Sequence, residues 1–196
     1  MEKPLPLILA SGSPRRKELL TGAGLEFSII VSDVDEDIPV KGTPAAHAKH
    51  LAEIKASAVA ELYPESFVIG ADTIVVVDGD ILGKPASEKE AERMLDRLSG
   101  RAHIVHTGWC IICRKKGFKF SGVEETLVQF KNLSPDEIKW YVKTGEPMDK
   151  TGAYAIQDKG AALVKSVVGS YTNVVGLPLC EVVEVLEREG FRRRGR

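Results

Sequence analysis

The sequence predicts an α/β fold in which helices flank a mixed central sheet. Six segments rich in apolar and β-branched residues have the length of strands, at 5–10, 27–31, 67–77, 103–113, 118–130 and 161–168. Helical segments separate the earlier strands, whereas later strands follow one another directly. Alternation favours parallel strands and direct succession favours antiparallel pairs, so we expect a sheet with both. Loops gathered at one side of such a sheet usually form the ligand cleft.

The helices are predicted from their start and stop signals. One helix begins at Thr43, carries apolar residues three and four positions apart, and ends before Pro64. Ser87 and Ser134 each begin a further helix, because a glutamate three residues later completes a capping box. A last helix follows Pro178. The apolar stripes of these helices should face the sheet.

Two tight turns join the later strands. The Asp-Gly dipeptide at Asp78 and Gly79 is typical of a two-residue hairpin. A second turn is expected from Lys115 to Gly117. Both turns favour antiparallel neighbours and therefore a mixed sheet.

Composition indicates a globular chain of one domain. The 196 residues are 43% hydrophobic and 28% charged, which is enough to build a core without disulfides or metal. A net charge of −1 argues against broad binding to nucleic acid or to an anionic membrane. The arginine run at 192–196 is expected to be a solvated terminus. No apolar stretch has the length of a membrane span or a secretory signal, so we expect a cytoplasmic location.

The three cysteines are expected to be reduced thiols. Cys110 and Cys113 form a CxxC pattern, which can indicate zinc or redox chemistry. They lie within a predicted strand, where positions three apart point to opposite faces. No second pair completes a set of four ligands, so we expect core thiols.

The segment LILASGSPRRKELL at 7–20 has the pattern of a phosphate-binding turn. Ser13 can cap a helix in which Pro14 takes the first position. Free amide groups at a helix start favour an anion. Arg15, Arg16 and Ser11 add further donors suited to phosphate oxygens. The alternative is an ordinary strand-to-helix turn with solvated arginines.

Asp72 is a candidate general base or metal ligand. It interrupts the apolar run at 68–77, where a carboxylate is costly unless it is paired or binds a metal. The alternative is an aspartate that caps a turn at a strand end. The acidic loop at 33–37 could supply one further ligand for a hard divalent cation, although such runs are usually only solvated.

Three other polar residues each allow two interpretations. Lys55 lies at the margin of the apolar stripe of its helix and either reaches into a cleft or, as sequence alone favours, extends to water. Lys84 beside a proline has the same alternatives. The amide of Gln157 could match the edge of a base, or it could be an ordinary loop residue.

Common catalytic motifs are missing from the sequence. It contains no GxxxxGK[ST], no GxGxxG after a strand, no GxSxG and no HExxH. The four histidines form no recognisable metal-ligand pattern.

Four longer motifs together resemble the Maf family of nucleotide pyrophosphatases. They are SGSPRR at 11–16, GADTIVVVDGDILGKP at 70–85, EPMDKTGAYAIQDKGA at 146–161 and SYTNVVGLPL at 170–179. The resemblance runs through nearly the whole chain and implies one Maf/ITPase-like domain, with a central mixed sheet and two lobes around a deep cleft. It also implies hydrolysis of non-preferred or modified nucleoside triphosphates to the monophosphate and pyrophosphate, with Mg²⁺ or Mn²⁺.

The resemblance further implies roles for individual residues. Asp72 matches the family's proton acceptor, and Arg15, Thr73 and Gln157 match positions associated with substrate choice. Matches to polar residues of the family's cleft are Ser11, Ser13, Arg16, Glu36, Lys55 and Lys84. The serines, Arg16 and the lysines are accordingly assigned to phosphate, and Asp72 with Glu36 to the metal. Asp158 stands where a glycine is more usual, next to Gln157.

Several functional alternatives remain at this stage. The third and fourth motifs are most similar to the branch that acts on dTTP and UTP. The same reaction could act on 7-methyl-GTP or another non-preferred nucleotide. A non-catalytic nucleotide-binding regulator of cell division is the alternative from a different class. The resemblance also makes a homodimer plausible.

Overall fold

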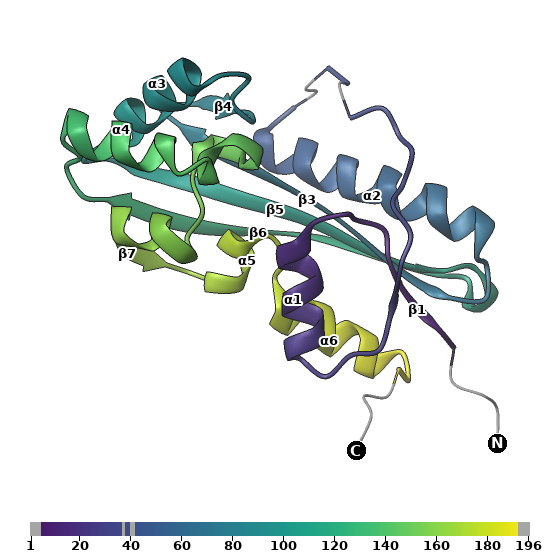
Figure 1. Ribbon diagram of the computed structural model, residues 1–196. Helices are drawn as coiled ribbons and strands as arrows, with labels where there is room; N and C mark the ends of the chain where they lie inside the picture. Colours follow the sequence, from purple (N-terminus) through teal and green to yellow (C-terminus); the bar gives the residue numbers. More distant parts are fainter. Residues whose placement is uncertain (1–4, 37, 40–41, 192–196) are drawn as a thin grey trace. The chain divides into compact units, whose positions relative to one another are not determined.

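The computed structural model describes residues 5–36, 38–39 and 42–191 (Figure 1). Asp37 and the arginine run at 192–196 therefore lie outside the described residues. The chain divides into two compact units. Unit 1 comprises Met1–Asp72, Thr107–Glu124 and Gly176–Arg196, and unit 2 comprises Thr73–His106 and Glu125–Val175. The boundary falls within β3 (Phe67–Val77), β5 (Ala102–Cys113) and β6 (Phe118–Phe130).

The strands form one mixed sheet, as the sequence predicts. The order is β2-β1-β3-β5-β6-β7, and β4 pairs with β3. β1 (Leu7–Leu9) is parallel to β2 (Ser28–Ile29) and to β3. β3 is antiparallel to β4 (Asp80–Leu82), and β6 is antiparallel to β7 (Val164–Val168). The turn between β3 and β4 contains Asp78 and Gly79, both at positive φ, which confirms the predicted hairpin.

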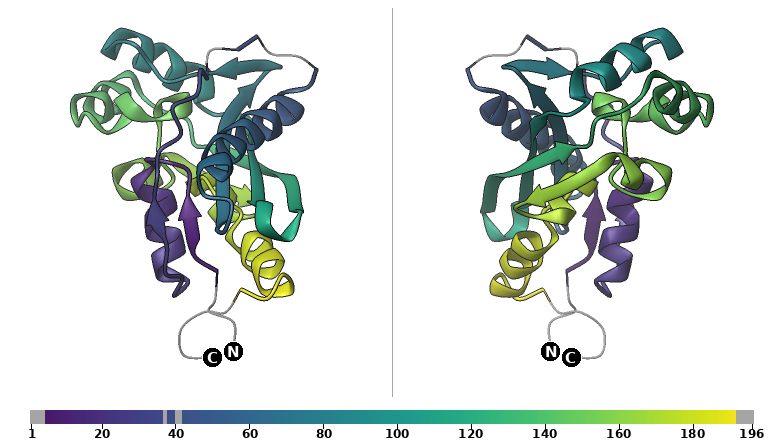
Figure 2. Two further views of the ribbon diagram at one scale, coloured as in Figure 1. Left: turned by 90° about the vertical axis from the view of Figure 1, so that its right-hand side faces the viewer. Right: turned by 90° about the vertical axis from the view of Figure 1, so that its left-hand side faces the viewer.

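In unit 1, helices cover both faces of the strands (Figure 1 and Figure 2). α2 (Pro44–Leu62) packs on one face against a cluster that includes Ile8, Val68 and Cys110. α1 (Pro14–Gly22) and α6 (Leu179–Arg188) pack on the other face against Leu9, Ile69 and other strand residues. Because neighbouring residues of each strand point to opposite faces, these central strands are apolar on both sides.

α2 approaches the sheet unusually closely because both surfaces are made of small residues. A Cβ atom added to Gly70 of β3 would lie 2.4 Å from the carbonyl oxygen of Ala52. One added to Gly108 of β5 would lie 2.3 Å from the backbone of Ala48. Glycine is therefore required at both strand positions if the helix backbone is to sit where it does. Ala48, Ala52 and Ala56 of α2 are fully buried at this contact.

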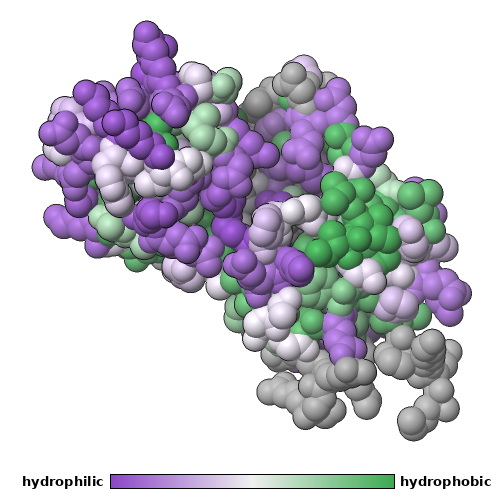
Figure 3. All heavy atoms as spheres, viewed as in Figure 1, coloured by the Kyte–Doolittle hydropathy of each residue, from purple (hydrophilic) through white to green (hydrophobic). Residues whose placement is uncertain are grey.

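In unit 2, α3 (Glu88–Leu98) and α4 (Pro135–Lys143) bury one apolar face each against β3, β5 and β6. Their outward surfaces are hydrophilic, as Figure 3 shows for the region over these helices. Ser87 and Ser134 cap them, and Ser134 with Glu137 forms the predicted capping box. The capping box predicted at Ser87 is wrong, because the Glu90 carboxylate accepts from the amide of Ala86 and not from that of Ser87. The helices after Ser13, Thr43 and Pro178 are likewise confirmed.

The structure also contains elements that the sequence did not predict. The predicted strand at 161–168 is too long, because residues 158–163 form the 3₁₀ helix η4 (Asp158–Leu163) and only Val164–Val168 is β7. α5 (Tyr171–Val175) is a further short addition. None of the helices in the described ranges combines the length and the apolar character that crossing a membrane requires.

The two cysteines of the CxxC pattern lie on opposite faces of β5, as predicted. Cys110 belongs to the cluster under α2, and Cys113 belongs to the cluster under α1 and α6. Both are free and fully buried. Burial raises the pKa of the Cys110 thiol to about 12, so this group is an inert core residue rather than a nucleophile.

Candidate active site

A buried ion pair lies at the centre of the candidate site in unit 1. The Lys55 ammonium donates to Oδ1 of Asp72 at 2.7 Å and lies 2.8 Å from Oε2 of Glu36. The side chain of Lys55 is only 7% exposed and that of Asp72 only 12%, whereas Glu36 is 56% exposed. The expectation that Lys55 extends to water is therefore wrong. The carboxylate of Asp72 offsets the desolvation cost of burying the Lys55 ammonium.

The close packing of α2 on β3 explains this pairing. Gly70 and Asp72 are two residues apart on β3, so their positions face the same side of the strand. That side carries α2, whose backbone contacts Gly70 at Ala52 and Ala56. Lys55 immediately precedes Ala56 and thus reaches Asp72 across a contact with little intervening side-chain volume. Asp72 is consequently an ion-paired residue within the strand and not a capping residue at its end.

The predicted phosphate-binding turn has the expected local structure. Ser13 occupies the N-cap of α1 with Pro14 in the first turn, and its hydroxyl accepts a hydrogen bond from the backbone amide of Arg16. The hydroxyl of Ser11 accepts from the backbone amide of Ser13 at 3.3 Å. These hydrogen bonds hold residues 11–16 in one conformation at the start of α1, as either a capped helix start or an anion site would require.

Arg16 has a structural role in this turn. Its Nε donates to the carbonyl oxygen of Gly176 at 2.7 Å, and its Nη1 donates to the hydroxyl of Ser11 at 2.9 Å. Burial lowers the pKa of the Arg16 guanidinium, while the charges of Asp72 and Glu36 act in the opposite direction. Arg16 thus ties α1 to the segment before α6, a connection of 160 residues in sequence that no local pattern indicates. Arg15 is half-buried beside it.

The remaining predicted site residues belong to unit 2. Thr73 follows Asp72 on β3 and is half-buried. Lys84 is exposed on the loop after β4. Gln157 is half-buried and takes the N-cap position of η4, but its side chain makes no capping hydrogen bond. The structure thus brings together Glu36, Lys55 and Asp72 within unit 1, and Ser11, Ser13 and Arg16 within that same unit.

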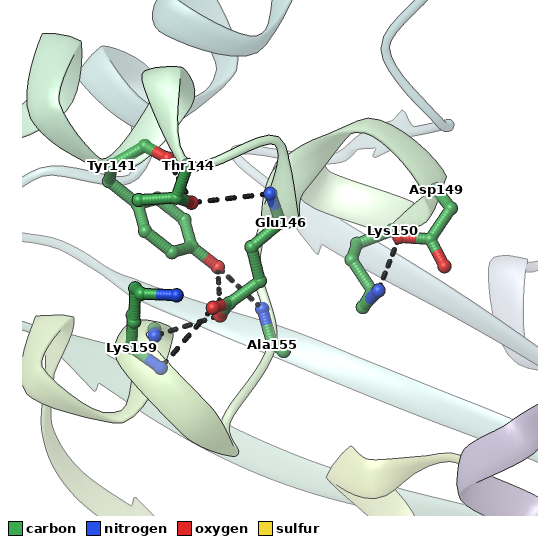
Figure 4. Close-up of polar contacts among 8 residues, drawn as sticks. Tyr141, Thr144, Glu146, Asp149, Lys150, Ala155 and Lys159 are labelled. Carbon is green, nitrogen blue, oxygen red and sulfur yellow. Dashed lines mark hydrogen bonds and ion pairs between the residues drawn. The ribbon is translucent and has the colours of Figure 1, made fainter.

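A polar cluster around Glu146 was not predicted (Figure 4). Oε1 of Glu146 accepts from the hydroxyl of Tyr141 at 2.8 Å and from the amide of Gly160 at 2.9 Å. Oε2 accepts from the amide of Lys159 at 3.3 Å, and the Tyr141 hydroxyl accepts from the amide of Ala155 at 3.2 Å. One signal was available: a tyrosine on the apolar face of a helix needs a partner for its hydroxyl.

A second unpredicted network explains the SYTN motif. Asn173 of α5 is fully buried, and its amide donates to the carbonyl oxygen of Val105 at 3.0 Å and to the hydroxyl of Thr126 at 2.9 Å. The same threonine hydroxyl donates to the carbonyl oxygen of Ser170. These bonds attach α5 to β5 and β6. The polar SYTN motif thus serves here to fix the backbone.

The carboxylate oxygens of the site are ligands of a type that a divalent cation takes. Asp72 and Glu36 converge on one positive charge, that of Lys55, and Mg²⁺ is typically held by one or two carboxylates together with substrate phosphates. Within the described part of the chain, no three His, Cys, Asp or Glu side chains form a group that could hold a metal by themselves. A metal held at these two carboxylates would therefore need further ligands from outside the described side chains.

Comparison with known proteins gives a consistent result. The profile of the family described as Maf-like protein matches residues 6–189. The chain is 52% identical to a dTTP/UTP pyrophosphatase of Symbiobacterium thermophilum, with 94% of each chain covered. It is 50% identical to the protein of that name from Syntrophus aciditrophicus, over 94% of this chain and 90% of the relative. The one from Geobacter sulfurreducens is 51% identical, with 94% and 96% covered.

Proposed function

This chain belongs to the family of Maf-like proteins, and we propose that it is a pyrophosphatase that hydrolyses dTTP and UTP to the monophosphate and pyrophosphate. Relatives about half identical over nearly their whole length carry the name dTTP/UTP pyrophosphatase. The structural observation that carries the proposal is the buried carboxylate of Asp72, held at 2.7 Å by Lys55. A buried, oriented carboxylate is suited to accept a proton from water.

In the proposed reaction, Asp72 accepts a proton from a water molecule as the water oxygen bonds to the α-phosphorus. The bond from the α-phosphorus to the bridging oxygen breaks, and pyrophosphate leaves with that electron pair. The products are therefore the nucleoside monophosphate and pyrophosphate. Lys55 holds the Asp72 carboxylate through Oδ1 and keeps it oriented for this transfer.

The phosphates are assigned to the start of α1. The N-terminal amide groups of this helix, the hydroxyls of Ser11 and Ser13 and the guanidinium of Arg15 offer the donors. Arg16 fixes this segment through Gly176. Lys84 supplies a further positive charge in the proposal. Such fixed donors stabilise charge that develops on the phosphate oxygens.

A divalent cation, Mg²⁺ or Mn²⁺, is proposed to bind at Asp72 and Glu36. When bound there, such an ion would supply positive charge that offsets the negative charge of the substrate phosphates. The support for this assignment is the convergence of both carboxylates on Lys55.

Base selection is proposed to depend on Gln157, with Arg15 and Thr73 also at positions that influence substrate choice. Thymine and uracil both present a carbonyl oxygen and an N–H group along one edge. The side-chain amide of Gln157 has the complementary donor and acceptor. Its side chain makes no hydrogen bond that caps η4.

The deciding experiment measures pyrophosphate release from dTTP, UTP, CTP, GTP, 7-methyl-GTP and ITP with Mg²⁺ or Mn²⁺, beside the Asp72→Asn variant. We expect selective turnover of dTTP and UTP by the wild-type chain. We expect Asp72→Asn to lose most of its turnover while it folds and still binds nucleotide.

Each other outcome has a defined meaning. Turnover of a different base would retain the reaction and change the substrate. Undiminished turnover by Asp72→Asn would contradict the assignment of the proton acceptor. Tight nucleotide binding without pyrophosphate release would favour a non-catalytic regulator.

A further inference from the structure

The segment 155–160, which contains Gln157, is attached at both of its ends to the pair formed by Tyr141 and Glu146 (Figure 4). We propose that Tyr141 and Glu146 are positioning residues that set the nucleobase preference of this chain by fixing the backbone that carries Gln157. This inference rests on the proposed function, in which Gln157 reads the base. We refer to the Tyr141 and Glu146 side chains together as the bracket.

The bracket reaches the segment through backbone amides at positions 155, 159 and 160. The amide of Ala155 donates to the Tyr141 hydroxyl, and the amides of Lys159 and Gly160 donate to the two carboxylate oxygens of Glu146. The hydroxyl and the carboxylate are themselves joined by a 2.8 Å hydrogen bond. Because the contacts are with backbone atoms, the bracket fixes the path of the chain on either side of Gln157.

The geometry around Gly160 shows how closely the parts fit. A Cβ atom at this position would lie 2.2 Å from the carbonyl oxygen of Ala155 and 2.6 Å from the Tyr141 hydroxyl. It would also lie 3.1 Å from Oε1 of Glu146. The two ends of the segment therefore come together at the bracket, and Gln157 lies on the loop between them.

The bracket is itself fixed from within unit 2. Tyr141 is fully buried in the core of this unit, on the apolar face of α4. Thr144 donates to the carbonyl oxygen of Tyr141 at 2.6 Å and accepts from the amide of Glu146 at 3.2 Å. The end of α4 thus determines where the carboxylate of Glu146 is placed.

Fixing the backbone matters for base choice because a side-chain amide has a donor at one end and an acceptor at the other. Cytosine presents the reverse pattern to uracil along the same edge, so an amide that can move and rotate would accept either base. Discrimination requires that only one arrangement be reachable. The left-handed conformation at Asp158, with φ of 53°, adds to this need, because a non-glycine residue adopts it at a cost in free energy.

The first test measures amide hydrogen exchange of the full chain in peptides that cover residues 155–160. Variants Glu146→Ala and Tyr141→Phe remove the carboxylate and the hydroxyl, and the second keeps the buried ring. Asp136→Asn, an exposed carboxylate in the first turn of α4, is the control for loss of one negative charge. We expect exchange in 155–160 to accelerate about 10-fold or more in both bracket variants and to be unchanged in the control.

The second test measures kcat/KM for dTTP and for CTP in the same variants, with Gln157→Ala as the reference for lost base reading. We expect the preference for dTTP over CTP to fall about 10-fold in each bracket variant, mainly through a higher KM for dTTP. Because both groups belong to one hydrogen-bonded unit, the double variant should lose no more preference than the more severe single variant.

The outcomes separate this inference from the proposed function. If amide exchange in residues 155–160 were as slow in both bracket variants as in the wild-type chain, the bracket would not fix this segment. Faster exchange with an unchanged preference would overturn its role in base choice, provided that Gln157→Ala alters the preference. A wild-type chain that hydrolyses neither dTTP nor UTP would contradict the proposed function, and the base-choice role with it. The exchange measurement would then still decide whether the bracket fixes the segment.

Discussion

Replacing Gly70 with alanine should disrupt the candidate site through packing alone. The added Cβ would lie 2.4 Å from the carbonyl oxygen of Ala52, 2.7 Å from the amide nitrogen of Ala56 and 2.9 Å from the Cβ of Ala56. Two of these atoms are backbone, so no side-chain rotation relieves the overlap. An ordinary contact of 3.4 Å requires α2 to retreat by about 1 Å. Overpacking of this kind costs about 3 kcal/mol of the free energy of unfolding.

The same displacement should reduce activity. Lys55 is on the displaced helix and Asp72 is on the strand, so their 2.7 Å contact must lengthen. A misplacement of about 1 Å can cost on the order of 100-fold in turnover. We therefore expect Gly70→Ala to lower both the urea midpoint, by about 1.5 M for a slope of about 2 kcal/mol per M, and dTTP turnover.

Gly22→Ala is the matched control for this experiment. Gly22 ends α1 in the same unit, and a Cβ atom there would meet nothing within 4 Å. This variant should be neutral or stabilised by up to about 1 kcal/mol, since alanine is the better helix former. If Gly70→Ala had the wild-type urea midpoint and wild-type turnover, the close approach of α2 would not be what places Lys55 against Asp72.

Three further predictions concern pH, Arg16 and metal. Burial lowers the pKa of His103 from 6.5 to about 4, so the folded state favours the neutral ring. The free energy of unfolding is therefore highest above pH 6.5 and falls as the pH is lowered towards 4. The total loss that His103 causes is about 3 kcal/mol. Urea unfolding across this range should show a shallower acid dependence for His103→Gln, and equal slopes would contradict the prediction. Arg16→Lys should lower the free energy of unfolding by about 2 kcal/mol, because an ammonium cannot replace both forked hydrogen bonds. Thermal unfolding of the variant tests this prediction. Arg15→Ala should instead weaken nucleotide binding and leave the free energy of unfolding unchanged. Removal of divalent cations with EDTA should abolish pyrophosphate release and re-addition of Mg²⁺ or Mn²⁺ should restore it; turnover that persists in EDTA would argue against the metal assignment.

Elements with strong local signals could be predicted from the sequence. The bounds of β3 and β6 coincide with the predicted ones, because β3 is a long run of β-branched residues and β6 begins directly after the tight turn at Gly117. The caps Thr43, Ser87 and Ser134 define their helices for the same local reason. Residues 161–163 were wrongly assigned to the strand at 161–168, because the structure there depends on a contact outside the segment itself. Glu146 holds the amides of Lys159 and Gly160, which begin η4.

The sequence indicated which types of residue form the candidate site, but not which of them contact one another. The position of Asp72 in an apolar run correctly indicated that it needs a partner, yet nothing local identified Lys55 as that partner. Lys55 lies at the margin of its helix stripe, where most lysines extend to water. Its burial depends on Gly70 and Gly108, which lie on two different strands and let α2 approach the sheet.

The same small-residue contact links the stability of unit 1 to its proposed chemistry. A buried ion pair stabilises a fold little beyond what well-packed apolar residues would provide, because desolvation offsets the attraction. Replacing Lys55 and Asp72 together with methionine and asparagine should therefore cost less stability than removing Lys55 alone, which leaves a carboxylate buried. Such a double variant would fold and yet release no pyrophosphate. If Lys55→Met alone were as stable as the double variant, the Asp72 carboxylate would be satisfied by something other than Lys55, and the ion pair would not be the basis of the site.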